Sequence, residues 1–219
     1  NNIGIGREAM FGNSTNPTGT HNIAIGREAL HDVSTGGSNI AIGNYALDAN
    51  TTGSQNNAVG YNSLSANTTG INNDAFGHAS MLSNTTGGYN IAMGRASLDA
   101  NTSGSNNIAL GPFALTSNTT AAYNVAIGYE ALEQNTTGTQ NVAVGSFALD
   151  ENVDGNYNNA FGHGSLGTNT SGDYNAAFGH GALNKNTTAD GNTAVGYNAL
   201  TANTTGDAHV AVGKDALLS

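Results

Sequence analysis

Three histidines recur in one short motif, Ala-Phe-Gly-His, at residues 75–78, 160–163 and 177–180. Imidazole nitrogens bind metal ions, and protonated imidazoles bind anions. His163 and His180 are 17 residues apart, the length of a repeat described below, so their side chains are expected to lie near each other. We therefore treat His78, His163 and His180 as candidate ligand-binding residues. The alternative is that they are surface or interface histidines that bind nothing.

The other reactive side chains do not form a recognisable catalytic set. Carboxylates such as Asp48, Asp99 and Asp150 are scattered at turn positions, and no Gly-x-Ser-x-Gly elbow is found. Calcium-binding Gly-Gly-x-Gly-x-Asp repeats and a phosphate-binding glycine loop are also missing. The sequence has no Cys, which excludes disulfides and thiolate metal sites. We expect a protein that is not an enzyme and that needs no metal or cofactor.

The composition limits the classes of partner. Of 219 residues, 15 are acidic and 5 are basic, which gives a net charge of −10. Without a basic patch, nucleic acid and anionic membrane surfaces are not expected partners. No apolar run approaches the ~18 residues of a membrane helix, so membrane insertion is not expected. The sequence does not begin with a signal peptide. Charged residues are 9% of the chain and 31 residues are Gly, which is unlike an ordinary globular domain.

An internal repeat spans the whole sequence. A Gly follows a small residue and an apolar residue at 13 positions, separated by 20 residues once and by 17 residues thereafter. The consensus is N-x-A-φ-G-x-x-[AS]-L-x-x-N-T-T-G-x-x, where φ is a large apolar residue. The longer first interval holds three additional residues, Asn13-Ser14-Thr15. This pattern predicts a single repeat domain over residues 1–219.

Each repeat predicts two short strands and a turn. In segments such as 124–128, apolar residues alternate with Ala, which is a strand pattern. We expect the apolar residues, such as Ile23 and Ile25, to face the core and the intervening Ala to face the opposite way. A second short segment around each Leu and a turn at Asn-Thr-Thr-Gly complete the repeat. Repeats of constant length stack in register, which predicts an all-β parallel β-solenoid or β-roll of thirteen coils.

Stacked coils would bring the strand-motif asparagines into a structural ladder, in which side-chain amides hydrogen-bond from coil to coil. The predicted ladder contains Asn22, Asn39, Asn56, Asn90, Asn107, Asn124, Asn141, Asn158, Asn175 and Asn192.

The alanine positions predict an oligomer. Each coil has about three large apolar side chains, so the core of one chain is thin. The strand alanines, represented by Ala109, Ala126 and Ala143, are small in every coil, as a closely approached surface would require. Close packing within the roll would also require small residues, but because the core of one chain is thin, we expect them to form the interface of a side-by-side homo-oligomer.

Two segments carry a resemblance to known proteins. Asn-Ile-Ala-Ile-Gly at 22–26 and 39–43 resembles the head repeat of trimeric autotransporter adhesins, and residues 192–206 resemble repeats of bacteriophage tail fibres. The resemblance implies a homotrimer and a structural or adhesive rod of a longer fibre, located outside the cell on a virion tail or a bacterial surface. It also implies attachment to a host, and the partner would be a host-surface glycan or protein.

Other interpretations remain open. Variable, partly aromatic residues follow the strand glycine, including Tyr61, Tyr129 and Phe147, and they fit either a sugar-recognition surface or an unconstrained corner. Asn-x-Thr sequences, such as that at Asn50, fit N-glycosylation or simple turn chemistry. Stacked Thr residues suggest a second function, ice binding by a monomer. Thr51 and Thr52 are adjacent, however, and cannot both face outward. The third alternative is a subunit of a self-assembling extracellular filament.

Overall fold

The computed structural model describes residues 1–11 and 18–218, so the additional residues expected at 13–15 lie outside the described part. Every regular element in that part is a three-residue β-strand. The chain divides into two units, Asn1–Asn107 (unit 1) and Ile108–Ser219 (unit 2), which are described separately. The strands of unit 1 are β1 (Ile3–Ile5), β2 (Ile23–Ile25), β3 (Ile40–Ile42), β4 (Asn57–Val59), β5 (Asp74–Phe76) and β6 (Ile91–Met93). Those of unit 2 are β7 (Ile108–Leu110), β8 (Val125–Ile127), β9 (Val142–Val144), β10 (Asn159–Phe161), β11 (Ala176–Phe178), β12 (Thr193–Val195) and β13 (Val210–Val212).

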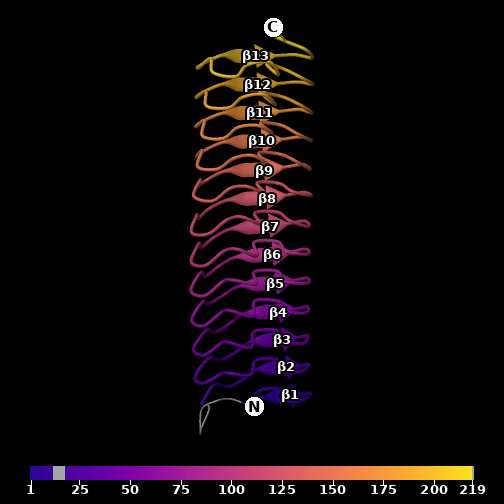
Figure 1. Ribbon diagram of the computed structural model, residues 1–219, viewed down its shortest axis with the longest axis vertical. Helices are drawn as coiled ribbons and strands as arrows, with labels where there is room; N and C mark the ends of the chain where they lie inside the picture. Colours follow the sequence, from indigo (N-terminus) through magenta and orange to yellow (C-terminus); the bar gives the residue numbers. More distant parts are fainter. Residues whose placement is uncertain (12–17, 219) are drawn as a thin grey trace. The chain divides into compact units, whose positions relative to one another are not determined.

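Within each unit, consecutive strands pair in parallel, one strand per coil (Figure 1). The register is constant: in unit 1 Ala24 lies opposite Ala41, and in unit 2 Ala126 lies opposite Ala143. Constant repeat length produces this register, because each coil places equivalent residues directly above those of its neighbour. The protein is therefore an all-β parallel β-solenoid, the fold class that the sequence predicts.

The faces of the strands are the reverse of the sequence prediction. The middle residue of each strand faces inward, and Ala24, Ala41 and Ala126 are 0% exposed. The first and third residues face outward, and Ile25 and Ile42 keep 37% and 38% of their surface exposed. The interior of a coil is too narrow for a large side chain on this wall. At Gly4, an added Cβ would lie 3.3 Å from the Ala9 carbonyl oxygen of the same coil.

The core is filled from the opposite wall. Leu residues such as Leu47 and Leu64 are completely buried beside small residues such as Ala46. The expected second strand in this segment is wrong, because the backbone forms turns in which alternate residues have positive φ. Tyr45 has φ 60° and Leu47 has φ 52°. This left-handed conformation costs non-glycine residues about 1–2 kcal/mol each. Leu47 offsets the cost through burial and through its N–H, which donates to the Ser63 carbonyl at 3.1 Å.

The glycine that ends each strand is required by the stacking. Gly60 has φ 141°, and a Cβ at this position would clash with the carbonyl oxygen of Gly77 in the next coil. Strand glycines throughout both units, such as Gly128, face the same obstruction. This explains why the repeat carries Gly at this position wherever another coil follows; at Gly213, in the last coil, an added Cβ would meet nothing within 4 Å.

Two ladders of buried asparagines link the coils. In the first ladder, Asn39 Nδ2 donates to Asn22 Oδ1 at 3.1 Å and to the Gly53 carbonyl at 2.9 Å. The asparagines that the sequence assigns to this ladder lie there, and Asn73 belongs to it as well. In the second ladder, Asn67 Nδ2 donates to Asn50 Oδ1 at 2.8 Å. These bonds satisfy amides that would otherwise be costly to bury.

In the part of the chain that the structure describes, no helix is long and apolar enough to cross a membrane.

Candidate ligand-binding groove

A column of rings runs along one corner of unit 2, just after the strand glycines. His163 and His180 stack nearly parallel, with ring centroids 5.1 Å apart and an interplanar angle of 8°. Phe147 packs edge-on against His163 at 5.5 Å, and Tyr197 stacks on His180 at 5.4 Å. The column continues through Tyr129, whose ring lies 5.5 Å from that of Phe147. The 17-residue period stacks His163, His180 and Tyr197, which each directly follow a strand glycine. Phe147 joins the column from the second position after its glycine.

Three glycines leave a hollow beside this column. Gly164 and Gly181 are the second residues after their strand glycines, with φ values of 61° and 66°. In other coils this position holds a side chain, such as Phe147 or Asn198. A third glycine, Gly167, removes another side chain from the same surface. The result is a groove of about 310 Å³, with Phe147, His163 and His180 among its lining residues.

The groove is also lined by polar side chains: Asp150, Glu151, Thr168, Asn184, Asn198 and Thr201. Asn184 Nδ2 donates to the Gly164 carbonyl at 2.8 Å, which fixes this side chain across the base of the groove. Thr168 Oγ1 donates to the Asn184 carbonyl at 2.8 Å. The side chains of Asn198 and Thr201 make no hydrogen bond to another described residue. They are therefore available to a ligand.

The groove carries negative charge at one end. Burial, the largest cause, raises the pKa of Asp150 to about 6. The backbone N–H of Asp150 opposes this rise, and the nearby carboxylates Glu151, Glu133 and Glu130 add to it. Asp150 and Glu151 line the groove with carboxyl oxygens that accept hydrogen bonds and disfavour anions. The site is thus suited to a ligand with hydroxyl or amide donors.

The three candidate histidines do not form one site. His163 and His180 line the groove in unit 2, whereas His78 belongs to unit 1. His78 stacks on Tyr61 at 5.4 Å in a similar column, in which Tyr61 packs against Tyr45 at 5.9 Å. Among residues 1–11 and 18–218, no three or more His, Cys, Asp or Glu side chains are grouped so that they could hold a metal ion. The stacked pair offers rings rather than a coordination sphere.

The alanines predicted to form an oligomer interface are buried inside the single chain. Ala109, Ala126 and Ala143 are 0% exposed, so their methyl groups have no surface to offer another copy. The prediction of an alanine interface is therefore wrong. Their small size reflects the narrow interior of the coil, and the outward surface of the strands is formed by the large apolar residues instead.

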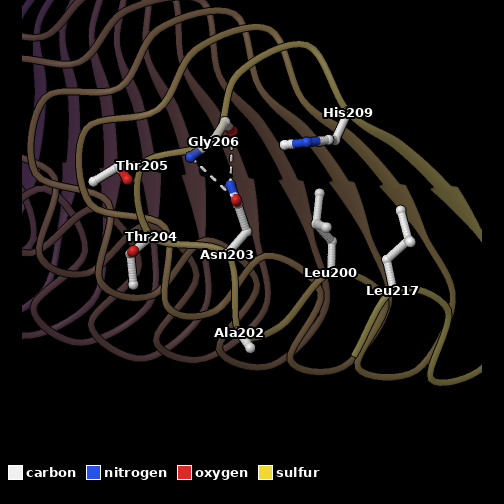
Figure 2. Close-up of a pocket in the computed structure, with 8 residues that line it drawn as sticks. All are labelled: Leu200, Ala202, Asn203, Thr204, Thr205, Gly206, His209 and Leu217. Carbon is white, nitrogen blue, oxygen red and sulfur yellow. Dashed lines mark hydrogen bonds between the residues drawn. The ribbon is translucent and has the colours of Figure 1, made fainter. Parts of the chain in front are cut away.

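A second hollow, of about 270 Å³, lies at the last described coil (Figure 2). Figure 2 shows Asn203, whose Nδ2 donates a hydrogen bond to the Gly206 carbonyl. Thr204 and Thr205 lie on one side of Asn203, and Leu200 and His209 lie on the other. In earlier coils the equivalent Leu183 and Asn186 are fully covered by the following coil. We assign no ligand to this hollow, because its walls are core positions of the solenoid.

Two other sequence motifs have structural roles. Asn50 and Asn67 of the Asn-x-Thr sequences are fully buried, and their Nδ2 atoms donate hydrogen bonds inside the coil. Glycosylation at Nδ2 is incompatible with this arrangement. In the Thr pair, Thr51 Oγ1 donates to the Thr68 carbonyl at 3.0 Å, and Thr52 alone is exposed. A single outward Thr per coil does not supply the paired rows of an ice-binding face.

The sequence indicated the histidines and the aromatic corner but not the groove. The signal that could have indicated the groove is the glycine at the same variable position of two adjacent repeats, Gly164 and Gly181. Together, the fold and the groove define a parallel β-solenoid with a lateral ring-lined surface. No protein-family model, curated protein or solved structure matches the chain at a significant level.

Proposed function

We propose that the protein is a structural and adhesive rod segment of an extracellular fibre, assembled as a homotrimer, which supports attachment to a host or another surface. The proposal rests on the outward face of the strands. The third strand residue is apolar in every coil of the described chain: Ile5, Ile25, Ile42, Val59, Phe76, Met93, Leu110, Ile127, Val144, Phe161, Phe178, Val195 and Val212. A surface that met only water would tolerate charged residues at this position.

The size and period of this face support association with copies of the same chain. Adjacent exposed side chains form a continuous apolar stripe within each unit, with Phe161 and Phe178 37% and 42% exposed. One such side chain per coil, at roughly 60 Å² exposed, gives on the order of 300 Å² over five coils, the size at which apolar patches often mark interaction sites. A partner that contacts every coil must repeat with the same spacing. A second copy of the chain meets this requirement, and the resemblance to trimeric fibres favours three copies.

The remaining elements of the proposal follow from the chemistry of the chain. A regular hydrogen-bonded solenoid with buried amide ladders supplies stiffness rather than a reaction centre, so we propose a mechanical rather than an enzymatic role. A self-assembling filament remains the alternative. Imaging distinguishes it from the trimeric rod, because a filament subunit would form long fibres from this segment alone.

The test compares two stacked aromatic pairs in neighbouring coils. The rings of Phe161 and Phe178 lie 5.0 Å apart on the outer strand face, and those of Tyr157 and Tyr174 lie 4.9 Å apart on another part of the coil. Light scattering of the wild type should give three times 22.0 kDa. The double variant Phe161→Glu/Phe178→Glu should give a folded monomer, and Tyr157→Glu/Tyr174→Glu should remain a trimer. A wild-type monomer would refute the trimer, and a trimeric phenylalanine variant would refute this interface.

A further inference from the structure

We propose that the groove beside His163 and His180 binds an uncharged, hexose-based glycan. The inference deepens the attachment role proposed above, and it names the ligand class and the residues that recognise it. It rests on three properties of unit 2: a ring wall, a hollow made by glycines, and polar groups that are not used by the fold.

The ring wall supplies the first property. A pyranose ring has a hydroxyl-bearing edge and an apolar face of C–H groups, and such a face packs on aromatic rings. His163 and His180 are both exposed, and their rings are nearly parallel at an interplanar angle of 8°. Phe147 lies at one end of this pair and Tyr197 at the other. Because these rings stack on one another, the column offers a ligand its exposed side, and this apolar wall extends over more than one coil.

The hollow supplies the second property. Its volume of about 310 Å³ lies at the lower end of the range for small-molecule sites. The space exists because Gly164 and Gly181 replace side chains at the same position in two adjacent coils. A Cβ on Gly164 would lie 3.4 Å from Asn184 Nδ2, so a larger side chain is compatible with the backbone and would project into the groove. Gly164 is thus not required by stacking, in contrast to the strand glycines, whereas a Cβ on Gly181 would lie 2.6 Å from Asn198 Oδ1 of the next coil.

The polar groups supply the third property and the preference for an uncharged ligand. Asn198 and Thr201 have donors and acceptors free for hydroxyl groups, and Asp150 accepts hydrogen bonds from hydroxyl donors. Asp150 and Glu151 repel an anionic sugar, and the chain as a whole carries a charge of −10. Sialylated and sulfated glycans are therefore excluded, and neutral hexose chains fit the set of side chains best.

The experiment uses a substitution that fills the groove without straining the backbone. Gly164→Asn places at φ 61° a residue type that tolerates this conformation, and Asn198 occupies the equivalent position two coils further on with φ 51°. Gly191→Asn is the matched control: Gly191 has φ 67°, has nothing within 4 Å of its added Cβ, and does not line the groove. His163→Ala/His180→Ala removes the ring wall, and His78→Ala removes the equivalent histidine of unit 1.

The full chain is applied to an array of neutral, amino and sialylated oligosaccharides, and a neutral binder is then titrated by NMR at the histidine Hε1 resonances. We expect saturable binding to a neutral glycan, with shifts of His163 and His180 but not of His78. Gly164→Asn should abolish binding, and the paired histidine variant should weaken it about tenfold. Gly191→Asn and His78→Ala should bind as the wild type does.

Binding of sialylated glycans only, or of no neutral glycan, would overturn the inference, as would neutral-glycan binding that survives Gly164→Asn. Light scattering of the same samples keeps the two proposals separate. A trimer without glycan binding refutes the groove alone, and a monomer that binds a neutral glycan refutes the trimer alone.

Discussion

Asn22 Oδ1 accepts two hydrogen bonds from Asn39 of the next coil, from its backbone N–H at 2.9 Å and from its Nδ2 at 3.1 Å. Asn39 Oδ1 in turn accepts a hydrogen bond from the backbone N–H of Asn56 at 3.0 Å. Each amide therefore stabilises two coils at once. The ladder satisfies backbone groups that the short strands leave unpaired. Its hydrogen bonds therefore contribute to the stability of every coil in the unit and not to one local contact.

The first prediction concerns this ladder in unit 2. Asn141→Leu removes the acceptor of the Asn158 N–H and the donor to the Gly155 carbonyl. Leaving these buried groups unpaired should lower the free energy of unfolding by about 3 kcal/mol. Asn159→Leu is the control, because Asn159 is half-buried on the outer strand face where other coils carry Val or Ile. Chemical unfolding followed by circular dichroism measures both variants, and equal stability of the two would contradict the ladder.

The second prediction concerns the strand glycine. Gly60→Ala should destabilise unit 1 by at least about 3 kcal/mol, because the backbone has φ 141° and the new methyl group meets the Gly77 carbonyl. Gly191→Ala, at φ 67° with open space around the added Cβ, should cost only about 1 kcal/mol. Thermal unfolding measures the loss of stability in both variants. Gly60→Ala reports the clash with the next coil together with the unfavourable φ, and Gly191→Ala reports the unfavourable φ alone. Similar losses in both would show that stacking does not require the glycine.

The third prediction concerns a half-buried carboxylate. Asp48 Oδ1 is buried and has no hydrogen-bond partner in the described chain. Burial raises the pKa of Asp48 from 3.8 to about 6, with smaller contributions from Asp32 and Glu28 and with backbone N–H groups opposing the rise. Because the folded-state pKa lies above the unfolded value, the protonated group contributes stability that is full below pH 3.8 and is lost as pH rises through 6.

Asp48→Asn should therefore match the wild type in acid and exceed it above pH 6. After allowance for solvent screening, we expect a gain of about 1–2 kcal/mol at pH 7. Ser65→Asn, at the equivalent position of the next coil, is uncharged before and after the substitution and should show no such pH dependence. Unfolding titrations from pH 3.5 to 8 give the comparison, and a gain that is constant across this range would exclude ionisation of Asp48 as its cause.

Much of the fold could be predicted from periodicity, because a constant 17-residue repeat permits stacking in register and little else. The Asn39 and Asn67 ladders follow from the same constraint. The direction of the strands' side chains could not be predicted, since alternation in a three-residue strand such as β3 identifies two faces without saying which is inside. The left-handed conformation of Leu47 could not be predicted either, because leucine ordinarily avoids positive φ.

The candidate groove was accessible to sequence reasoning only in part. The repeated Ala-Phe-Gly-His motif placed His163 above His180, and the structure brings them together. The hollow depends on the absence of side chains at Gly164 and Gly181, which a consensus treats as variation at a turn. Only the register of the two coils shows that both absences fall on one surface.

The last prediction follows from the corrected direction of the strand alanines. At the equivalent position in β1, a Cβ on Gly4 would lie 3.3 Å from the Ala9 carbonyl and 3.7 Å from Met10 Sδ, so this wall faces the opposite side of its own coil. Ala126 is 0% exposed in the same environment. Ala126→Leu should therefore overpack the coil and cost about 1–3 kcal/mol or more, whereas Ala126→Gly should cost about 1 kcal/mol.

Ala126→Glu distinguishes burial within the chain from burial between chains. A carboxylate at this position has no exposed surface and no partner, so we expect loss of folded structure by circular dichroism rather than release of folded monomers. The matched substitution Ile127→Glu lies on the outer strand face, where the side chain is 37% exposed, and should leave the chain folded while it weakens association. A folded Ala126→Glu monomer would contradict this burial and would support a subunit interface formed by the alanines. An unfolded Ala126→Glu protein beside a folded but dissociated Ile127→Glu protein would place the alanines in the core and the large apolar residues on the contact surface.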